Sequence, residues 1–387
     1  MEIVNSSVNN ASSNPRVIVV GLGAHGSSTT YQLAKRGITV TGIDQFHPPH
    51  SMGSSHGPSR VMRMAYKEGA GYVPMLRRSF DLWQELNDLY SEPSFHLTGG
   101  LFMGQPDGRA ISGIHTASKA QNIDISIMTP DEVRRKYPSF NIPDEWEAIW
   151  DPKSGAIFPE IAITAHLDLA EKAGAELSFN EKIEKWSATP SGVTVTTSRK
   201  TYEADVLILT SGAWITEMLA NLKIPFEIER VTLWMIEPRA NRDFFQAGTF
   251  PNASFEIFEK YPLYMQADFG TGVKVALDHH GVTTDVKSIN RNTTREDYEK
   301  IFEQIRRFVP DLDGEVLNSA VCMYTNTPDL NFVVDRHPAH DNVIIGSACS
   351  GHGFKFSPVI GEILADLATR ETPKFDLKMF NATRFKS

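Results

Sequence analysis

The chain has 387 residues, of which 41% are hydrophobic and 22% are charged, as is usual for a globular protein, and its formal net charge is −9. The length suffices for two to three domains, and the acidic balance argues against nucleic acid or an anionic membrane as a partner. No run of 18 or more apolar residues is present, so we expect no membrane span. The two cysteines, Cys322 and Cys349, are too few for a disulfide framework and favour a reducing compartment.

Neither end of the chain carries a clear targeting signal. Residues 1–15 are rich in Asn and Ser and lack the apolar core of a signal peptide, so we expect a disordered tail. The last three residues, Phe385-Lys386-Ser387, differ from the Ser-Lys-Leu peroxisomal address. We therefore expect a cytoplasmic protein, with a peroxisomal location left open.

The first ordered stretch has the pattern of a dinucleotide-binding unit. It begins with an apolar strand at 17–20 and the glycine turn Gly21-Leu22-Gly23-Ala24-His25-Gly26. A helical run at 27–36, a second strand at 38–43 and the acid Asp44 follow. This order is more specific than the glycine motif alone. It predicts dinucleotide binding, without separating NAD from FAD, and the alternative is a glycine turn in an ordinary α/β unit.

Each part of such a turn would have its own physical role. Gly21 allows the sharp turn, Gly23 lets the backbone approach a pyrophosphate, and Gly26 lets the helix pack closely on the strand. The first residues of the helix, Ala24 and His25, would offer unpaired N–H groups to the phosphates. Asp44 would accept hydrogen bonds from the ribose hydroxyls.

Hydrophobic spacing predicts the elements that follow. We expect helices over 72–89, 129–137 and 160–173 and strands over 99–104, 175–179, 183–188 and 192–197. Residues 53–63 read as a loop. The apolar run 204–209 predicts a parallel strand whose end meets the cofactor at Gly212 and Trp214.

The composition changes between residues 226 and 316, where strands at 231–236 and 272–277 lie among polar loops. A helix is expected over 295–308, with Thr294 as its N-cap. We interpret this part as an antiparallel sheet inserted into the dinucleotide domain. From 320 the chain is expected to return to that domain through a strand at 342–346, a second glycine turn and a helix over 358–368.

Four motifs together are specific enough to identify a family. They are the first glycine turn, Gly53-Ser54-Ser55-His56-Gly57 with Arg60 and Arg63, Cys322-Met323-Tyr324-Thr325, and Ser350-Gly351-His352-Gly353-Phe354-Lys355. With them the chain, from about 17 to 384, resembles the monomeric sarcosine oxidase, N-methyltryptophan oxidase and pipecolate oxidase family of FAD enzymes. Fructosyl-amine oxidases usually lack this pair of arginines, so an Amadori-product substrate is disfavoured.

The resemblance implies an α/β fold in which a glutathione-reductase-type FAD-binding domain carries an inserted antiparallel-sheet substrate domain. The FAD-binding domain would comprise 16–95, 150–222 and 320–387, and the substrate domain 96–149 and 223–319. The resemblance also implies a monomer without a metal site.

The resemblance further implies that FAD is covalently bound through Cys322 to the flavin 8α carbon. The alternative for Cys322 is a small buried hydrophobic side chain, and Cys349 is expected only to pack. Other residues implied to contact the cofactor are Ser54, His56, Ser59, Arg60, Gly351, Gly353, Phe354 and Lys355.

Arg63 and Lys355 match the residues with which family members hold the substrate carboxylate. An arginine fork suits a carboxylate bidentately, and lysine adds a point charge. The alternative for each is a solvated surface charge. Tyr264 would form an aromatic wall of the substrate pocket, and His352 is either near the flavin edge or a packed structural residue.

Lys274 matches the lysine that family members place over the flavin to assist the reaction with oxygen. A fixed cation there would stabilise negative charge developing on oxygen, whereas the alternative is a charge on an edge strand. The family often has a histidine four residues later, where this chain has Asp278, followed by His279. Which of these two faces the site is left open. Pro58 and Met64 also depart from the family pattern beside the arginine loop.

The implied activity is oxidation of the C–N bond of a secondary α-amino acid to an imine, with O2 reduced to hydrogen peroxide. Sarcosine, N-methyl-L-tryptophan, pipecolate and an alkaloid-like amine all stay open as substrates. Two alternatives remain: an FAD-dependent amine dehydrogenase with another electron acceptor, and a non-catalytic dinucleotide-binding redox sensor.

Overall fold

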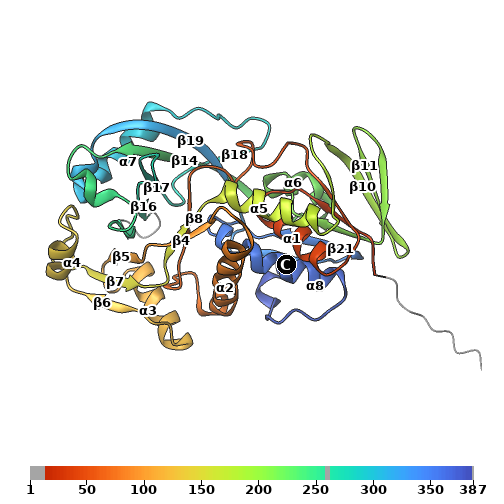
Figure 1. Cartoon of the computed structure of the whole chain (residues 1–387), viewed down its shortest axis with the longest axis horizontal. Coiled ribbons are helices and arrows are strands. Elements are labelled where there is room, and N and C mark those ends of the chain that lie inside the picture. Colours follow the sequence, from red (N-terminus) through yellow and green to blue (C-terminus); the bar gives the residue numbers. More distant parts are fainter. Residues whose placement is uncertain (1–13, 258–261, 386–387) are drawn as a thin grey trace, which may run out of the picture.

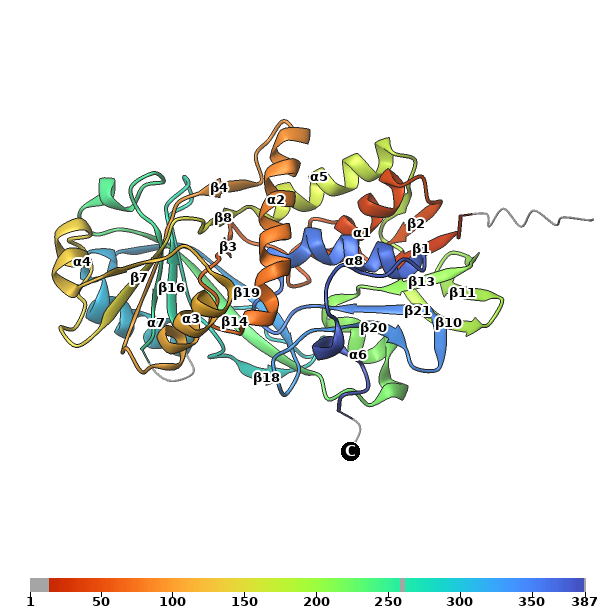
Figure 2. The ribbon, with the colours of Figure 1, turned by 90° about the horizontal axis from the view of Figure 1, so that it is seen from below.

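The computed structural model describes residues 14–257 and 262–385, so most of the tail expected at 1–15 lies outside the described residues. The chain forms two lobes, and helix α2 (Val73–Leu89) lies where they meet (Figures 1 and 2). One lobe is built on a mostly parallel sheet and the other on a larger, mostly antiparallel sheet. Within the described residues, no helix has the length and apolarity to span a bilayer.

The sheet of the first lobe carries the dinucleotide motif at its centre. Its strands, in spatial order, are β20 (Val333–His337), β21 (His340–Ser347), β13 (Val206–Leu209), β1 (Val17–Val20), β2 (Val40–Ile43) and β9 (Glu176–Ser178). All neighbours are parallel except β20 and β21. Every residue of β1 and β13 is buried, as their continuous apolar sequences predict for central parallel strands.

The two faces of this sheet are covered differently, because alternate side chains of a strand point to opposite faces. Val17 and Val19 of β1 pack with helices α1 (Ala24–Lys35), α5 (Pro159–Lys172) and α8 (Ser357–Ala368). Ile18 and Val20 face a small antiparallel sheet. Its strands are β10 (Ile183–Thr189), β11 (Gly192–Thr197) and β12 (Thr201–Ala204).

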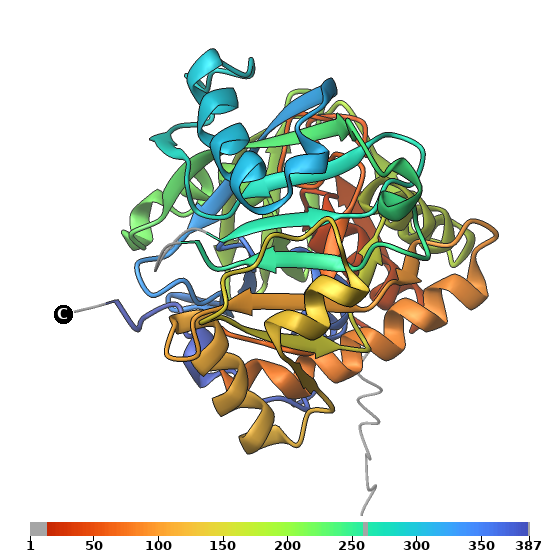
Figure 3. The same ribbon diagram turned by 90° about the vertical axis from the view of Figure 1, so that its left-hand side faces the viewer.

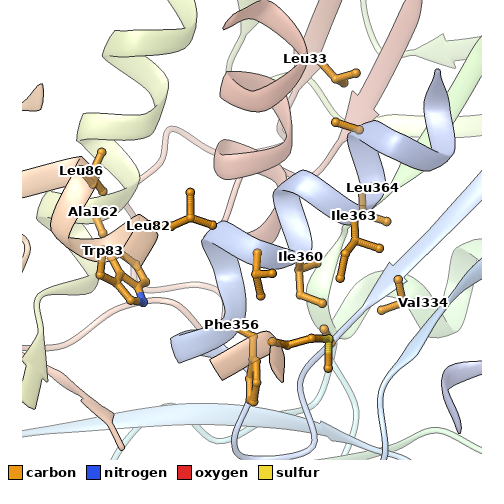
Figure 4. Close-up of a cluster of buried hydrophobic side chains, with 14 of the residues drawn as sticks. Leu33, Leu82, Trp83, Leu86, Ala162, Val334, Phe356, Ile360, Ile363 and Leu364 are labelled. Carbon is orange, nitrogen blue, oxygen red and sulfur yellow. The ribbon is translucent and has the colours of Figure 1, made fainter. Parts of the chain in front are cut away.

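A cluster of buried side chains joins the helices to each other. Figure 4 shows members of this cluster from three helices: Leu33 of α1, Leu82 and Trp83 of α2, and Ile360 and Leu364 of α8. These five side chains are all nearly inaccessible to solvent. Burying one such side chain is worth about 1.5–3 kcal/mol, so this cluster fixes α8 and the glycine turn that precedes it.

The second lobe has a nine-stranded sheet. Its strands, in order, are β18 (Val282–Thr284), β14 (Glu227–Glu237), β17 (Val273–Leu277), β16 (Leu263–Gln266), β15 (Asn252–Phe255), β5 (Gly100–Gly104), β7 (Glu147–Asp151) and β6 (Ser126–Met128), with β19 (Glu315–Asn326) paired to β14. The expectation of an antiparallel sheet needs one correction, because β5 and β15 run parallel. They come from segments far apart in the chain, so no hairpin constrains their direction.

Helices cover the outer face of this sheet, and its inner face is turned toward the first lobe. Helices α4 (Pro130–Lys136) and α7 (Arg295–Phe308) lie on the face that is turned to the viewer in Figure 3. Helix α3 (Arg109–Gln121) instead packs at the inner side, against Phe102. Thr294 caps α7 as predicted, with its hydroxyl accepting the Asp297 N–H at 3.1 Å.

Two further differences from the sequence-based expectations concern the chain between the lobes. The second half of the expected loop 53–63 forms strand β3 (Arg60–Met62), which pairs with β8 (Gly155–Ile157), and β4 (Phe95–Leu97) completes this small sheet. The domain limits expected at 150 and 320 fall inside β7 and β19. The domain division along the chain therefore stays a prediction.

Candidate active site

A cavity of about 720 Å³ lies at the carboxyl ends of β1, β2 and β13 and along the N-terminus of α1. Ligands of open α/β sheets bind in this position, where the strand order switches direction. Residues predicted from the sequence to bind the cofactor line it, namely Gly21, Gly23, Ala24, His25, Asp44, Ser54, Gly212, Trp214 and Phe354. The volume lies within the roughly 300–1,000 Å³ range of cofactor and ligand sites.

The glycines of the first turn have the backbone geometry that these roles would require. Gly21 has φ +88°, and a Cβ there would lie 2.6 Å from Ser211 Cα. A Cβ on Gly26 would lie 1.7 Å from the Gly21 carbonyl oxygen, so Gly26 serves packing and does not line the cavity. A Cβ on Gly23 would touch only Ser55, and would otherwise fill space in the cavity. The backbone is thus left open at the point where a pyrophosphate would approach.

Asp44 is held in a fixed orientation at the edge of the cavity. Its two carboxylate oxygens accept the N–H groups of Leu22 at 2.7 Å and Phe46 at 2.8 Å. Each carboxylate oxygen has a second lone pair. Asp44 can therefore accept ribose hydroxyls without giving up its structural bonds.

Several buried polar atoms in the cavity wall lack a partner. His25 Nε2, Ser54 Oγ and Ser211 Oγ have no hydrogen-bond partner among the described residues. An unsatisfied buried polar group costs about 1–3 kcal/mol. A cofactor rich in donors and acceptors would satisfy these atoms, so the cavity fits FAD in both its polar groups and its backbone cradle.

A second, smaller cavity of about 110 Å³ lies between the lobes and adjoins the first. Ser54, Cys349 and Phe354 line both cavities. The predicted catalytic residues all line the smaller one, namely Arg63, Tyr264, Lys274, His352 and Lys355, together with Arg60, Cys322, Gly351 and Gly353. Residues that are widely separated in sequence are thus brought to one place.

Arg60 organises the loop beside Cys322. Its guanidinium donates to the carbonyl oxygens of Ser54 at 3.0 Å, His56 at 2.7 Å and Ser59 at 2.9 Å. The Cys322 thiol lies 3.8 Å from Arg60 Nη2 and is 3% exposed. A positive charge therefore stands beside a buried thiol at the cavity wall. Cys322 belongs to β19, which pairs with β14 in the large sheet.

Lys274 projects from β17 into the small cavity and is 1% exposed. Its ammonium donates to the Ser59 carbonyl and to Gln266 Oε1 at 3.3 Å, and stands 5.5 Å from the centre of the Tyr264 ring. Burial, and secondly Arg60, lower the pKa of Lys274 well below its usual value. Lys274 is therefore a buried cation site and not an edge charge. Ser59 does not line the cavity but supports Lys274 from behind.

Arg63 and Lys355 lie at another part of the same cavity. Arg63 Nη2 pairs with Glu68 Oε1 at 2.6 Å, while Arg63 Nε has no partner among the described residues. Lys355 Nζ donates to the His352 carbonyl at 2.6 Å. Burial, and secondly Arg63, lower the pKa of Lys355 to about 7. Both side chains are largely buried, so neither is a solvated surface charge.

Three buried histidines near the site are neutral at pH 7. Burial lowers the pKa of His25, His56 and His352 to about 4, and Arg60 acts in the same direction on His56. In His352 both ring nitrogens are bonded, to the Tyr66 hydroxyl at 2.6 Å and to the Leu330 carbonyl at 3.0 Å. His352 thus has the bonding of a structural residue at the cavity wall. His56 does not line either cavity.

The open choice between Asp278 and His279 is resolved by the cavity lining. Asp278 lines the small cavity, whereas His279 Nδ1 lies 3.2 Å from Glu229 Oε2. Asp278 accepts the Tyr324 hydroxyl at 3.3 Å. The acid therefore faces the site, and the histidine supports the turn at Gly351.

Some residues of the site were not predicted from the sequence. Glu68 is paired with Arg63, and Gln266 and Asn252 form a hydrogen-bonded chain behind Lys274 and Ser59. The only signal for Glu68 is an acid five residues after an arginine, which is common by chance. Cys349, expected only to pack, also lines both cavities, with its sulfur accepting the Thr325 N–H at 3.3 Å.

The fold and the paired cavities define a flavoprotein oxidoreductase, and comparison with known proteins agrees. Residues 16–367 match the family model described as FAD dependent oxidoreductase. Monomeric sarcosine oxidase of Streptomyces avermitilis is 37% identical over 372 residues, which cover 95% of this chain and 97% of that enzyme. N-methyl-L-tryptophan oxidase of Salmonella heidelberg is 30% identical over 371 residues, covering 95% and 98%. The chain belongs to the FAD-dependent oxidoreductase family that includes these oxidases.

Two solved structures with this fold are more distant in sequence. L-Proline dehydrogenase from P. horikoshii has a TM-score of 0.84 at 23% identity, covering 96% of this chain and 98% of that one. NikD, an amino acid oxidase of nikkomycin biosynthesis, has a TM-score of 0.83 at 21% identity, covering 95% and 97%. At these identities the likeness shows the fold alone. The fold is shared by a dehydrogenase and an oxidase, so it does not decide between them.

Proposed function

We propose that this protein is an FAD-dependent oxidase of secondary α-amino acids, such as N-methyl or cyclic amino acids. It would oxidise the C–N bond to an imine and reduce O2 to hydrogen peroxide. The observation that carries the proposal is the convergence of Arg63 and Lys355 in a buried cavity that adjoins the dinucleotide cavity. Two cationic groups beside a cofactor site suit a substrate that carries a carboxylate next to its amine.

The carboxylate would bind at the edge of the Arg63 guanidinium that carries Nε and Nη2. Arg63 Nε is unpaired, and Nη2 is shared only with Glu68, so a carboxylate that displaces Glu68 gains both donors of one edge. Burial tends to raise the pKa of Glu68, but Arg63 and then Lys67 lower it to about 2. Glu68 is therefore an anion that competes with the substrate carboxylate.

The remaining residues would orient the amine and assist the reaction with oxygen. FAD, when bound, would accept the hydride equivalent, which carries the two electrons of the oxidation. Tyr264 and Phe102 wall the cavity and exclude water, and the clamp fixes the direction of the amine. The imine then hydrolyses in water, releasing an aldehyde if the amine was N-methylated. Lys274 would stabilise negative charge that develops on oxygen.

Three finer features complete the proposal. FAD is covalently held by Cys322. The protein is a monomer, as the name monomeric sarcosine oxidase says of its relatives. The amine is sarcosine, N-methyl-L-tryptophan, pipecolate or an alkaloid-like amine. Peroxide formation over a panel of N-methyl and cyclic amino acids is the direct test of the function. Flavin bleaching by an amino acid without peroxide formation would instead indicate a dehydrogenase.

Loss of either clamp residue is expected to weaken carboxylate binding. A charge-assisted hydrogen bond is worth about 1.5–3 kcal/mol, so Arg63→Ala or Lys355→Ala should raise the Kd of methylthioacetate by roughly 10- to 150-fold. Binding is measured from the change in flavin absorbance. Arg63→Lys keeps the charge but loses the guanidinium fork, so it should bind methylthioacetate nearly as weakly as Arg63→Ala does. Equal Kd values for wild type and both alanine variants would contradict the clamp.

Carboxylate binding is also expected to weaken with rising pH. Lys355 has a pKa of about 7 in the free protein, and only its protonated form attracts a carboxylate. A bound carboxylate raises that pKa, so binding is strongest below pH 7, and Kd then rises by up to about tenfold per pH unit. Lys355→Met should remove this dependence. A wild-type Kd that is constant between pH 6 and 9 would contradict the assignment.

A further inference from the structure

The small cavity has two chemically different ends along strand β17. Lys274, Ala276 and Asp278 are alternate residues and therefore point to the same side of the sheet. Asp278 continues the ladder beyond the strand, because its N–H donates to the Pro262 carbonyl at 3.0 Å. Four residues of strand separate the Cα atoms of Lys274 and Asp278 by about 13 Å. Both side chains line the cavity, so Asp278 marks the end away from Lys274.

Asp278 is a carboxylate with unused acceptor capacity. Its Oδ1 accepts the Tyr324 hydroxyl, and its Oδ2 lies 3.6 Å from Lys67 Nζ, which is longer than a hydrogen bond. Burial tends to raise the pKa of Asp278, but His279, Lys67 and Arg63 lower it. The group is therefore ionised at neutral pH and presents a negative charge to a cavity whose other charged lining residues are cationic.

Two adjacent residues of one loop face the charged groups of the cavity. Lys67 stands opposite Asp278, and Glu68 pairs with Arg63. The loop thus contributes one positive and one negative group to these contacts, as would a ligand that carries both a carboxylate and a cationic group. A substrate of that kind could replace both loop contacts at once, whereas a substrate with an apolar side chain could replace only the contact at Arg63.

We propose that Asp278 is a specificity-determining residue that accepts a hydrogen bond from a cationic group at the far end of the substrate. The preferred substrates are then secondary α-amino acids with a basic side chain. This inference rests on the proposed function, since the carboxylate at Arg63 sets the direction in which the side chain extends. Lys67 competes for Asp278 and is displaced by the substrate.

The test compares ligands of the holoenzyme that differ only in a terminal amine: butanoate, pentanoate and hexanoate against their ω-amino forms. Binding is followed by flavin absorbance and needs no turnover. The best ω-amino ligand should bind the wild type roughly 10- to 150-fold more tightly than its alkanoate, as expected for one charge-assisted bond. In Asp278→Asn this preference should disappear, while the alkanoates should bind at least as tightly as they do to wild type, because the variant removes a negative charge that interacts with Arg63 and Lys355. In Lys67→Met the preference should increase.

Glu299→Gln, which removes an exposed acid of α7, is the matched control and should keep the wild-type preference. The inference is overturned if wild type shows no preference, if the preference survives in Asp278→Asn, or if that variant weakens both ligand series equally. If Asp278 instead recognised the α-amine, glycine would bind more tightly than acetate, and this difference would disappear in Asp278→Asn. That result would also overturn the inference. If no carboxylate binds, the proposed function fails as well; if alkanoates bind without an amine preference, only the role of Asp278 fails.

Discussion

Acid-precipitated Cys322→Ser protein is expected to release all of its FAD into the supernatant, whereas the wild-type precipitate stays yellow. Cys322 Sγ lies at the wall of the small cavity, 3.5 Å from the Ser54 carbonyl oxygen and next to the Arg60 guanidinium. A neighbouring cation assists the reaction of a thiol as a nucleophile. The effect is all-or-none, because a thioether survives denaturation and hydrogen bonds do not.

Cys349 supplies the control for this experiment. It lines both cavities, so position alone would leave it as a rival attachment site. Burial raises the pKa of Cys349, which makes its thiolate rarer. Cys349→Ser should therefore keep covalent flavin. Colour that remains with Cys322→Ser but is lost from Cys349→Ser would transfer the attachment to the other thiol, and colour lost from wild type would exclude covalent attachment.

The second large effect is expected at Lys274. Lys274→Met keeps the length of the side chain but removes its charge, and loss of one preorganised group that stabilises developing charge costs about 10²- to 10³-fold in rate. Reoxidation of the reduced enzyme by O2 should slow by that amount, while reduction by the amine should change less than about tenfold. The two half-reactions are timed separately by anaerobic stopped flow.

Two variants make this result specific. Lys355→Met removes the second lysine that lines the small cavity and should weaken substrate binding while leaving reoxidation near the wild-type rate. Lys274→Arg retains the charge and should recover part of the lost rate. Since burial lowers the pKa of Lys274, the wild-type reoxidation rate should also fall as pH rises, and this dependence should vanish in Lys274→Met. A methionine variant that reoxidises as fast as wild type would remove Lys274 from the mechanism.

The parts that were predictable from the sequence depend on local interactions. The turn at Gly21 follows from steric limits that only glycine meets, and the Thr294 cap follows from a hydroxyl placed three residues before an amide. Continuous apolar runs likewise predicted the buried strands β1 and β13. Resemblance to a family, and not periodicity, supplied Arg63, Lys274 and Lys355.

The parts that were not predictable depend on pairings between distant segments. The parallel neighbours β5 and β15 are far apart in sequence, and the long pairing of β19 with β14 carries Cys322 into the large sheet. The contact of Lys67 with Asp278 has no periodic signature either, and the pairing of Glu68 with Arg63, although local, has a spacing that is common by chance. Such pairings form only when segments far apart in the chain meet in the folded protein, so an interpretation of local sequence pattern cannot find them.

The position of Cys322 on β19 also bears on how FAD is retained. The cradle that would hold the dinucleotide belongs to one lobe, while the thiol belongs to the sheet of the other, whose strand β19 reaches the Gly212–Trp214 turn of the first. A cofactor tethered at Cys322 could leave the cradle only as far as its own length, and its return would be intramolecular. Tethering of this kind gives an effective concentration in the millimolar range. Contacts that alone give a Kd well below that concentration would then keep the 720 Å³ cavity filled at any dilution of the protein.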